Sequence, residues 1–505
     1  MTSPLRPRHP RRTSLSDLVA EVGGLHLADP SEEGAATTVT GVSLSSQRVV
    51  PGDLYAALPG ARAHGVDYAG PAVEAGAVAV LSDAAGASRA VGLGVPVLVA
   101  EDPRALLGRL AAHVYGDPAT RMRMVGVTGT QGKTTTTRLA ETGLHAAGVG
   151  AAVIGTVGTR VKGVDVRTTL TTPEAPDLHG LFAAMVEQDV EACAMEVSSH
   201  ALVMGRVDGI VFDVAVFLNL GRDHLDFHAD VEDYFRAKAA LFTPERARLA
   251  LLNVDDEHGR RLVREATVPV RTFSATGAEA DWRAVDVELH PHGSRFRVLG
   301  PDGLEVAAAC PIPGGFNVAN TLAAVAACAE AGLGAARVAD GIASGAGVPG
   351  RLERVEAGQD FVVVVDYAHK PDAVEAAVAA LRPVTEGRLL VVLGAGGDRD
   401  PGKRPIMGEI ASRLADVLVV TDDNPRTEDP AAVRAAVLAG ATGGAEVLEV
   451  GDRRAAIREA LARARAGDVV LVAGKGHETG QEVAGVVHPF DDREVVREEL
   501  EAVRS

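Results

Sequence analysis

The sequence predicts an α/β fold of three domains, and three observations lead to that expectation. At 505 residues the chain is too long for one ordinary hydrophobic core. Near residue 130 a glycine-rich loop stands between an apolar segment and a helix-compatible segment, and beyond residue 345 short apolar runs alternate with helical segments. We expect an N-terminal domain over residues 1–118, a central P-loop domain over 119–345, and a C-terminal doubly wound, Rossmann-like domain over 346–505.

The first domain opens with short apolar runs that are typical of strands, at residues 54–58, 77–81 and 97–100. A helix should follow them, because Asp102 can cap it and Pro103 suits its first position. Gly116 should end that helix. The turn at residues 116–118 is the first boundary, and the glycine-rich stretch at 345–350 is the second.

The glycine-rich loop of the central domain has the composition of a phosphate-binding loop. It consists of Gly129, Thr130, Gln131, Gly132, Lys133, Thr134 and Thr135. Backbone N–H groups at the glycines can surround phosphate oxygens, Lys133 can neutralise their charge, and the Thr134 hydroxyl can bind Mg²⁺. The usual P-loop spacing is not met, because Val127 stands where the first glycine belongs. ATP is therefore the first ligand to consider, and a glycine turn with a chance Lys-Thr pair is the alternative.

The C-terminal domain shows the pattern of an open parallel sheet wound on both faces. Its apolar runs lie at residues 361–365, 389–393, 417–420 and 469–473. A charged segment follows each run, and these segments are Asp366–Asp372, Gly394–Asp400, Asp422–Arg426 and Gly474–Glu478. Ligands of such sheets bind at the carboxyl ends of the strands, so these segments are candidate binding residues.

Composition excludes several classes of partner. The 50 basic and 68 acidic residues give a net charge of −18, which argues against nucleic acid or an anionic membrane as the main partner. The three cysteines lack metal-ligand spacing and are too few for a disulfide framework, which favours a reducing cytoplasm. The arginine-rich N-terminus lacks the apolar core of a signal peptide, and no apolar run approaches the ~20 residues that span a bilayer. We expect small-molecule substrates, no membrane insertion and a monomer.

An ordered set of segments resembles the Mur ligase family of peptidoglycan synthesis, and most closely its MurE-type tripeptide synthetases. The matching segments are Pro51–Leu54, the loop at 128–134, Leu170–Glu174, Glu196–His200, Asn219–Asp226, Lys238–Phe242, Gly315–Asn320 and the four C-terminal segments. The family uses the shorter loop spacing. The resemblance implies a three-domain Mur ligase architecture. The N-terminal domain would bind the UDP-muramoyl dipeptide, the central domain ATP, and the C-terminal domain the incoming amino acid. This resemblance further implies an ATP-dependent, Mg²⁺-requiring ligase that acts through an acyl phosphate.

The resemblance also implies catalytic roles for Lys133, Glu196, His224 and Lys238. Glu196 and Thr134 would contribute to one Mg²⁺ beside the phosphates, and His224 would hold a second ion. Lys238 would be carbamylated, which turns a cation into an anion. The alternatives are a locally hydrogen-bonded carboxylate for Glu196, a capping or core residue for His224, and a snorkelling surface residue for Lys238.

By the same resemblance, the other end of ATP would meet Asn317, Asn320, Arg351, Asp366 and His369. Helix capping by the asparagines and a surface ion pair between Arg351 and Glu353 are the alternatives. The UDP-muramoyl dipeptide would contact Leu44, Ser46, Thr171, Thr172, Ser198 and Arg206. As alternatives, Ser46 is a turn residue and the two threonines are strand residues.

The tetrad Asp423, Asn424, Pro425 and Arg426 matches the members of the family that add diaminopimelate rather than lysine. Diaminopimelate carries a second carboxylate, and an arginine fork can bind a carboxylate through two parallel hydrogen bonds. Arg426 would bind this distal carboxylate and Arg399 the other one, while Glu478 with the Gly474 backbone would take the distal ammonium. The alternative is an Asn-Pro turn with a solvated arginine.

Two other function classes compete with this reading. One is a folylpolyglutamate synthetase, which shares the ligation chemistry but takes a pterin substrate. The other is a nucleotide-gated binding module without catalysis. An assay of phosphate release would separate the three functions, because only the Mur ligase should require both a UDP-sugar peptide and an amine.

Overall fold

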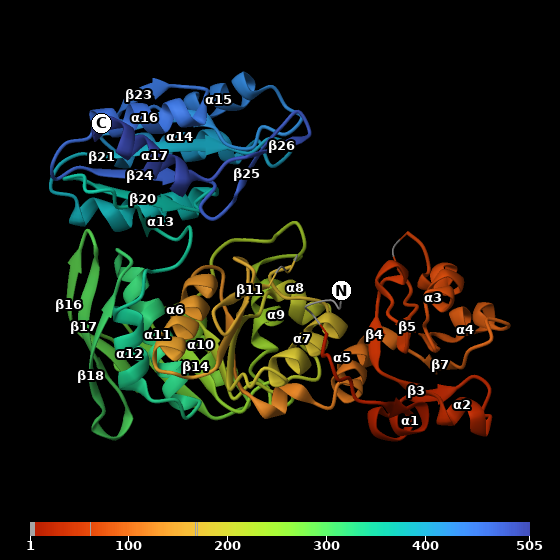
Figure 1. Cartoon of the computed structure of the whole chain (residues 1–505). Coiled ribbons are helices and arrows are strands. Elements are labelled where there is room, and N and C mark those ends of the chain that lie inside the picture. The colour runs from red at the N-terminus through yellow and green to blue at the C-terminus, as the bar shows by residue number, and fades with distance from the viewer. Residues whose placement is uncertain (1–5, 61, 167, 169, 505) are drawn as a thin grey trace. The chain divides into compact units, whose positions relative to one another are not determined.

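The computed structural model describes residues 6–504, apart from 61, 167 and 169 (Figure 1). The chain forms two compact units. One contains the chain up to Ser274 with Ala278–Trp282 and Ala323–Val338, and the other contains Ala275–Gly277, Arg283–Leu322 and the chain from Ala339 onward. This division does not test the boundaries at residues 118 and 345, which stay predictions.

The first unit begins with a five-stranded sheet in the order β2-β7-β6-β5-β4. Its strands are β2 (Leu25–Leu27), β4 (Gly41–Ser43), β5 (Asp53–Ala56), β6 (Ala79–Ser82) and β7 (Val97–Ala100), and its helices include α1 (Leu15–Val22), α3 (Ala69–Glu74), α4 (Ala84–Ala90) and α5 (Pro103–Val114). The predicted helix is α5, and Asp102 caps it by accepting from the N–H groups of Arg104 and Ala105. It ends at Tyr115, and Gly116 follows with a left-handed φ of 76°.

The P-loop strand lies in the middle of a parallel sheet in the same unit. The sheet contains β8 (Arg123–Thr128), β9 (Ala151–Ile154), β12 (Ala192–Glu196), β13 (Val214–Phe217), β14 (Ala250–Asn253) and β15 (Val270–Ser274), with β10 (Thr159–Val161) and β11 (Val164–Val166) antiparallel at one edge. Its helices include α6 (Lys133–Ala146), α7 (Ala175–Val186), α8 (Ser199–Val203), α9 (Val231–Ala239) and α10 (Glu257–Glu265). β12 and β13 flank β8, with Glu196 opposite Val127 and Phe217 opposite Thr128. The carboxyl ends of these three strands therefore meet at the P-loop.

Trp282 is the single tryptophan of the chain and follows this sheet. Its ring is buried, and its Nε1 donates to Glu330 Oε1 at 2.8 Å. A buried indole N–H of this kind needs an acceptor, and the carboxylate supplies it.

The second unit contains an antiparallel ribbon, further helices and the C-terminal sheet. The ribbon consists of β16 (Trp282–His290), β17 (Gly293–Leu299) and β18 (Glu305–Cys310). The helices α11 (Gly315–Glu330) and α12 (Ala335–Ala343) follow it along the chain, and part of each belongs to the first unit. The sheet is ordered β19-β20-β24-β21-β22-β23, with β19 (Glu353–Arg354), β20 (Val362–Asp366), β21 (Leu389–Ala395), β22 (Val417–Asp422), β23 (Glu446–Glu449) and β24 (Val469–Ala473). Every pairing in it is parallel except that of β19.

Helices cover both faces of the C-terminal sheet. Residues of α16 (Arg453–Arg463) and α17 (Asp492–Arg504) share a core with alternate residues of the strands, such as Val363 and Val392. The other helices are α13 (Pro371–Leu381), α14 (Lys403–Leu414) and α15 (Pro430–Leu438), which pack in sequence against one another on the opposite side (Figure 1). The doubly wound expectation is confirmed, and the four charged segments follow the carboxyl ends of β20, β21, β22 and β24.

No helix within the described residues is long and apolar enough to cross a membrane.

Candidate functional site

The P-loop is held in shape by its own lysine and by a neighbouring asparagine. Gly132 has φ 86° and directly precedes α6, a left-handed position that suits glycine. Lys133 Nζ donates to the carbonyl oxygens of Gly129 at 2.7 Å and Thr130 at 3.0 Å. Asn219 Oδ1 accepts from the N–H groups of Thr130 and Gln131. The lysine ammonium and the helix N-terminus thus converge on one loop, as an anion site requires.

Glu196 lies beside this loop at the end of β12 and is almost fully buried. Its Oε1 accepts from Thr156 N at 2.7 Å, and its Oε2 accepts from Thr156 Oγ1 at 3.1 Å. Glu196 therefore has the local hydrogen bonds that were expected if it were only a structural carboxylate. Each carboxylate oxygen keeps a second lone pair, so these bonds are compatible with a metal ligand as well.

Lys238 is not a surface residue, and the snorkelling alternative is wrong. The side chain is 1% exposed on α9, and its Nζ donates to Gly129 O at 3.0 Å. The ammonium also lies 4.5 Å from the ring centre of Tyr234. Burial lowers the pKa of Lys238 well below its usual value of 10.5, and the charge of Lys133 lowers it further. At neutral pH a larger fraction of Lys238 is therefore in the neutral amine form than in an exposed lysine.

His224 lies in a group of aromatic rings next to the P-loop. It has φ 55°, and its Nε2 lies 3.5 Å from Asp223 Oδ2. Its ring centre is 4.9 Å from that of His200 and 6.0 Å from that of Tyr234. The Tyr234 hydroxyl and Thr130 Oγ1 are 3.2 Å apart, which links this group to the loop.

The chemistry of these donors fits Mg²⁺ beside a nucleotide. Among the described residues, no three His, Cys, Asp or Glu side chains come together as a metal site. Mg²⁺ does not need such a cage, because it commonly takes one or two protein oxygens together with phosphate oxygens and water. Glu196 and the hydroxyl of Thr134, in the first turn of α6, offer hard oxygens of this kind. The imidazole of His224 is a softer donor, and its metal role stays a prediction.

Most of the residues expected to bind the dipeptide lie around Glu196. Thr172 Oγ1 donates to Glu196 O at 2.8 Å and accepts from Ser198 N at 3.3 Å. Thr171 Oγ1 lies 3.1 Å from Thr156 Oγ1, the hydroxyl that also bonds Glu196.

Arg206 and the two first-domain residues complete that expected set. Arg206 pairs with Glu174 at 2.8 Å and donates to Thr172 O at 3.4 Å, so it already has an anionic partner. Leu44 packs against the core of the N-terminal sheet, and Ser46 begins a short 3-10 turn.

The residues expected at the far end of ATP fall into two groups within the second unit. In α11, Asn317 Nδ2 donates to Pro313 O and Asn320 Nδ2 donates to Asn317 Oδ1, and both side chains are buried. A capping asparagine would instead accept from a helix N–H. Asp366 accepts from the N–H groups of Leu352 and Ala368.

Arg351 lies over a ring of the same segment. Its guanidinium is 4.9 Å from the ring centre of Tyr367, which in turn stands 4.5 Å from that of His369. Glu353, the partner in the alternative reading, lies 3.6 Å from Arg493. Burial raises the pKa of Asp366 and Arg351 opposes that shift, while burial lowers the pKa of His369.

A close backbone contact fixes the start of this segment. Gly350 has φ 66°, and a Cβ there would stand 2.3 Å from His477 N. Only glycine fits, so the stretch before Arg351 is held against the Gly474–Glu478 segment.

The residues expected to bind the amino acid surround a buried lysine. Asn424 Nδ2 donates to Glu478 Oε2 at 2.9 Å, and Lys475 Nζ donates to Asn424 Oδ1 at 2.8 Å. A Cβ on Gly474 would lie 3.4 Å from Asp423 Oδ2. The segments after β22 and β24 are thus brought together as the sheet rule predicted.

The two arginines of this set differ in setting. Arg426 is half-buried, its Nη1 donates to Gly397 O at 2.6 Å, and its Nε lies 3.3 Å from Glu482 Oε2. It is therefore not a freely solvated arginine at the Pro425 turn. Arg399 is exposed after β21.

Comparison with known proteins identifies the family. Residues 127–328 match the Mur ligase middle domain, residues 350–476 match the Mur ligase glutamate ligase domain, and residues 38–115 match the Mur ligase family catalytic domain. The chain is 56% identical, over 99% of its length and 98% of the relative, to a Streptomyces avermitilis protein named UDP-N-acetylmuramoyl-L-alanyl-D-glutamate--2,6-diaminopimelate ligase. The chain belongs to the Mur ligase family.

Solved structures agree with this assignment. A structure of a UDP-N-acetylmuramoyl-L-alanyl-D-glutamate--2,6-diaminopimelate ligase has a TM-score of 0.72 and 32% identity, and the alignment covers 98% of this chain and 100% of that one. A Mycobacterium tuberculosis folylpolyglutamate synthase reaches a TM-score of 0.57 at 19% identity over 72% of this chain and 91% of that one, a likeness of fold alone. The three-domain α/β Mur ligase architecture is confirmed, and members of the Mur ligase family use ATP.

Several residues that the Mur ligase fold places at these sites were not predicted from the sequence. They are Asn219, which holds the loop, Tyr234 and His200 in the aromatic group, Lys475, and the chain formed by Asp233, His228 and Ser199. In that chain, His228 Nδ1 lies 3.1 Å from Asp233 Oδ2 and its Nε2 lies 2.9 Å from Ser199 Oγ. Most of these residues stand inside matched segments, so position within a segment was the available signal.

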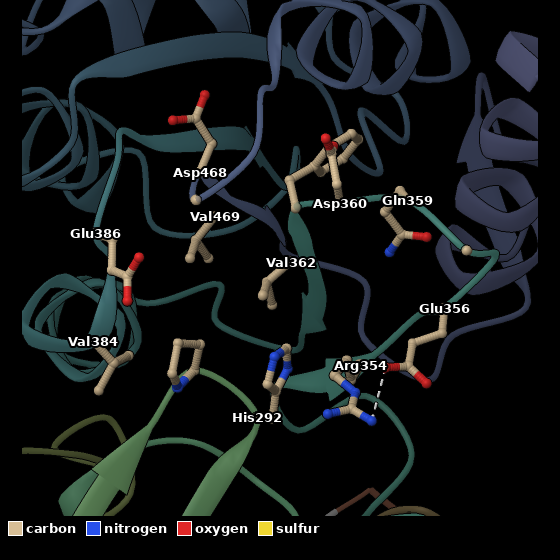
Figure 2. Close-up of a pocket in the computed structure, with 14 residues that line it drawn as sticks. His292, Arg354, Glu356, Gln359, Asp360, Val362, Val384, Glu386, Asp468 and Val469 are labelled. Atoms are coloured by element: carbon tan, nitrogen blue, oxygen red, sulfur yellow. Dashed lines mark ion pairs between the residues drawn. The ribbon is translucent and has the colours of Figure 1, made fainter.

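One cavity of this Mur ligase is lined by none of the residues that were predicted to bind a ligand or to act in catalysis. It has a volume of about 560 Å³ and lies at the amino ends of β20 and β24, beside Val362 and Val469 (Figure 2). Figure 2 also shows Arg354 paired with Glu356 at its wall. The predicted amino-acid residues lie at the opposite, carboxyl ends of the same strands, so this cavity is not the expected substrate site.

Proposed function

We propose that this chain is an ATP-dependent ligase that joins 2,6-diaminopimelate to the D-glutamate of UDP-N-acetylmuramoyl-L-alanyl-D-glutamate. The reaction belongs to the synthesis of peptidoglycan precursors, and we expect it in the cytoplasm. The observation that carries the proposal is the bond between Asn424 and Glu478 at the carboxyl edge of the C-terminal sheet, where Glu482 connects Asn424 to Arg426. The activity named for the 56% identical Streptomyces avermitilis protein supports it.

The proposed chemistry has two transfers. The D-glutamate carboxylate attacks the γ-phosphorus of ATP and ADP leaves, which gives an acyl phosphate. An amine of diaminopimelate then attacks the acyl carbon, the C–O bond to phosphate breaks, and the nitrogen loses a proton. Both steps spread negative charge, so preorganised positive groups and N–H donors contribute most.

This chain offers such groups at the P-loop. Lys133 would exchange its bonds to the Gly129 and Thr130 carbonyls for phosphate oxygens. Thr134 and Glu196 would hold Mg²⁺, which neutralises phosphate charge when bound. Asn317, Asn320, Arg351, Asp366 and His369 would bind the rest of ATP.

Lys238 would act as a carbamate in the same region. Carbamylation joins the amine nitrogen to CO₂ and releases a proton, so the side chain becomes an anion. The lowered pKa of Lys238 supports this proposal, because only the neutral amine attacks CO₂.

The remaining roles concern the two organic substrates. Thr171, Thr172, Ser198 and Arg206 would line the peptide path, with Leu44 and Ser46 near the uridine. Arg399 and Arg426 would bind the two carboxylates of diaminopimelate, and Glu478 with Gly474 would take its distal ammonium.

One assay tests the proposal against both alternatives. Phosphate release would be measured with ATP, Mg²⁺, the UDP-muramoyl dipeptide and a panel of amines, and Lys133→Ala would serve as the inactive control. We expect release only when the dipeptide and diaminopimelate are both present, and little with lysine. Release with a folate and glutamate would indicate a folylpolyglutamate synthetase. ATP binding without release under any combination would indicate a binding module.

A further inference from the structure

Lys475 lies at the centre of the expected amino-acid site, although no ligand role was expected for it. Its side chain is fully buried, with 0% exposure. Its Nζ lies 2.8 Å from Asn424 Oδ1 and 3.4 Å from both Asp423 Oδ1 and Glu478 Oε2. One buried cation therefore touches two carboxylates and the amide between them.

The contacts of Lys475 determine how Asn424 is turned. Asn424 Oδ1 accepts from Lys475 Nζ and from Glu482 N at 3.0 Å, so the amide nitrogen must face the other way. That nitrogen donates to Glu478 Oε2 at 2.9 Å. The cation thus orients Asn424, and Asn424 orients the carboxylate expected to meet the substrate.

Exposure shows which side of the cluster a ligand can reach. The side chains of Lys475 and Asp423 are 0% and 7% exposed, whereas that of Glu478 is 34% exposed. Lys475 therefore lies beneath the site and Glu478 faces its open side. A substrate ammonium can reach Glu478 without touching Lys475.

The charge of Lys475 bears on which amino acid the site accepts. Without it, the carboxylates of Asp423 and Glu478 would lose the cation that they share, and the expected amino-acid site would become more negative. That negative charge would repel the second carboxylate of diaminopimelate and favour lysine, whose net charge is positive because it lacks this carboxylate.

We propose that Lys475 is a positioning residue that sets selectivity for an amino acid with a second carboxylate. Its charge neutralises the carboxylates of Asp423 and Glu478, and its hydrogen bond fixes the orientation of Asn424 and, through it, of Glu478. This inference rests on the proposed function, and it predicts a change of preference rather than a general loss.

The test replaces the cation while keeping a hydrogen-bond donor. Lys475→Gln can still donate to Asn424 Oδ1 but carries no charge. We expect kcat/KM for diaminopimelate to fall at least about tenfold, as for a lost buried charge contact. The value for lysine should fall much less, and the KM values for ATP and for the UDP-muramoyl dipeptide should stay near those of the unmodified enzyme.

Two further variants separate selectivity from structure. Lys475→Arg keeps the charge and should retain more of the preference for diaminopimelate than Lys475→Gln. Arg388→Gln is the matched control, because Arg388 pairs with Asp468 at the amino end of β21, away from the site. It should leave the preference unchanged.

The outcomes divide cleanly. An equal fall for both amino acids, or no change for either, in folded Lys475→Gln protein would overturn the inference. If that variant does not fold, a folded Lys475→Arg protein that uses diaminopimelate and lysine equally would overturn it too. If the unmodified enzyme uses neither diaminopimelate nor lysine, the proposed function fails instead.

Discussion

Replacing Lys238 with alanine tests the least expected part of the proposed mechanism. The side chain is 1% exposed, and it contacts the P-loop through the carbonyl of Gly129 at 3.0 Å. In its carbamylated form, the residue would place an anion next to the loop and to Lys133. The substitution removes that preorganised charge and the bond to Gly129 O, but it changes no residue of the loop itself.

The expected loss follows from the position of this charge. Removing one preorganised group that stabilises a transition state typically lowers kcat by ~10²–10³-fold. We therefore expect Lys238→Ala to lose at least that much activity in the phosphate-release assay. The deletion also leaves a space beside Tyr234, so a small carboxylic acid such as acetate should restore part of the rate.

A second readout detects the modification directly. Enzyme equilibrated with ¹³C-bicarbonate should give a carbamate carbon signal that Lys238→Ala lacks. Arg236→Ala is the control on the same helix, because Arg236 is 58% exposed and forms surface ion pairs with Glu232 and Glu265. Full activity of folded Lys238→Ala, or an unchanged carbamate signal in it, would refute the reasoning.

Three further changes should have distinct effects. Arg426→Ala should cost about 2–4 kcal/mol of transition-state binding with diaminopimelate and much less with lysine, because a charge-assisted contact is lost, and kcat/KM for both amino acids measures this. Burial lowers the pKa of His179 from 6.5 to about 4, so between these values the unfolded chain binds a proton that the folded chain does not. The free energy of unfolding should therefore fall as pH drops through that window, by up to about 3 kcal/mol, and His179→Leu should lose this dependence in urea titrations. Asp492→Ala should destabilise the protein by about 3–5 kcal/mol in the same titrations, because it leaves the fully buried Arg453 without its partner at 2.7 Å.

For each of these three predictions, one result would contradict the reasoning. Equal losses with diaminopimelate and lysine would remove Arg426 from carboxylate recognition. Parallel acid-unfolding curves for the His179→Leu and unmodified proteins would show that this imidazole is not the acid-sensitive group. A normal unfolding midpoint for Asp492→Ala would mean that water reaches Arg453.

The edge of the sheet that carries the C-terminal site could be predicted because it depends only on the parallel direction of the strands. In a parallel sheet the carboxyl ends of the strands lie at one edge, so the segments after β22 and β24 were expected at the same edge, although β21 stands between these two strands. The P-loop followed from the same logic, since β8 leads straight into α6. Both predictions needed only local sequence and the rule of the fold.

The burial of the two lysines could not be predicted in this way. An amphipathic pattern shows which face of α9 is apolar, but it does not show that the P-loop carbonyl of Gly129 covers Lys238. Lys475 stands in a loop, where no periodicity exists. In the chain of Asp233, His228 and Ser199, the bonded pair His228 and Ser199 stands 29 positions apart, so only the folded chain brings it together.

Trp282 gives this protein a built-in optical reporter. A chain with a single indole has one red-edge emitter, so its fluorescence describes one place rather than an average. That place is a buried position where the ring N–H donates to the Glu330 carboxylate. Transfer of the ring to water on unfolding should shift the emission to longer wavelength. The same signal needs no attached dye, and it should report any nucleotide-linked change that reaches the end of α11.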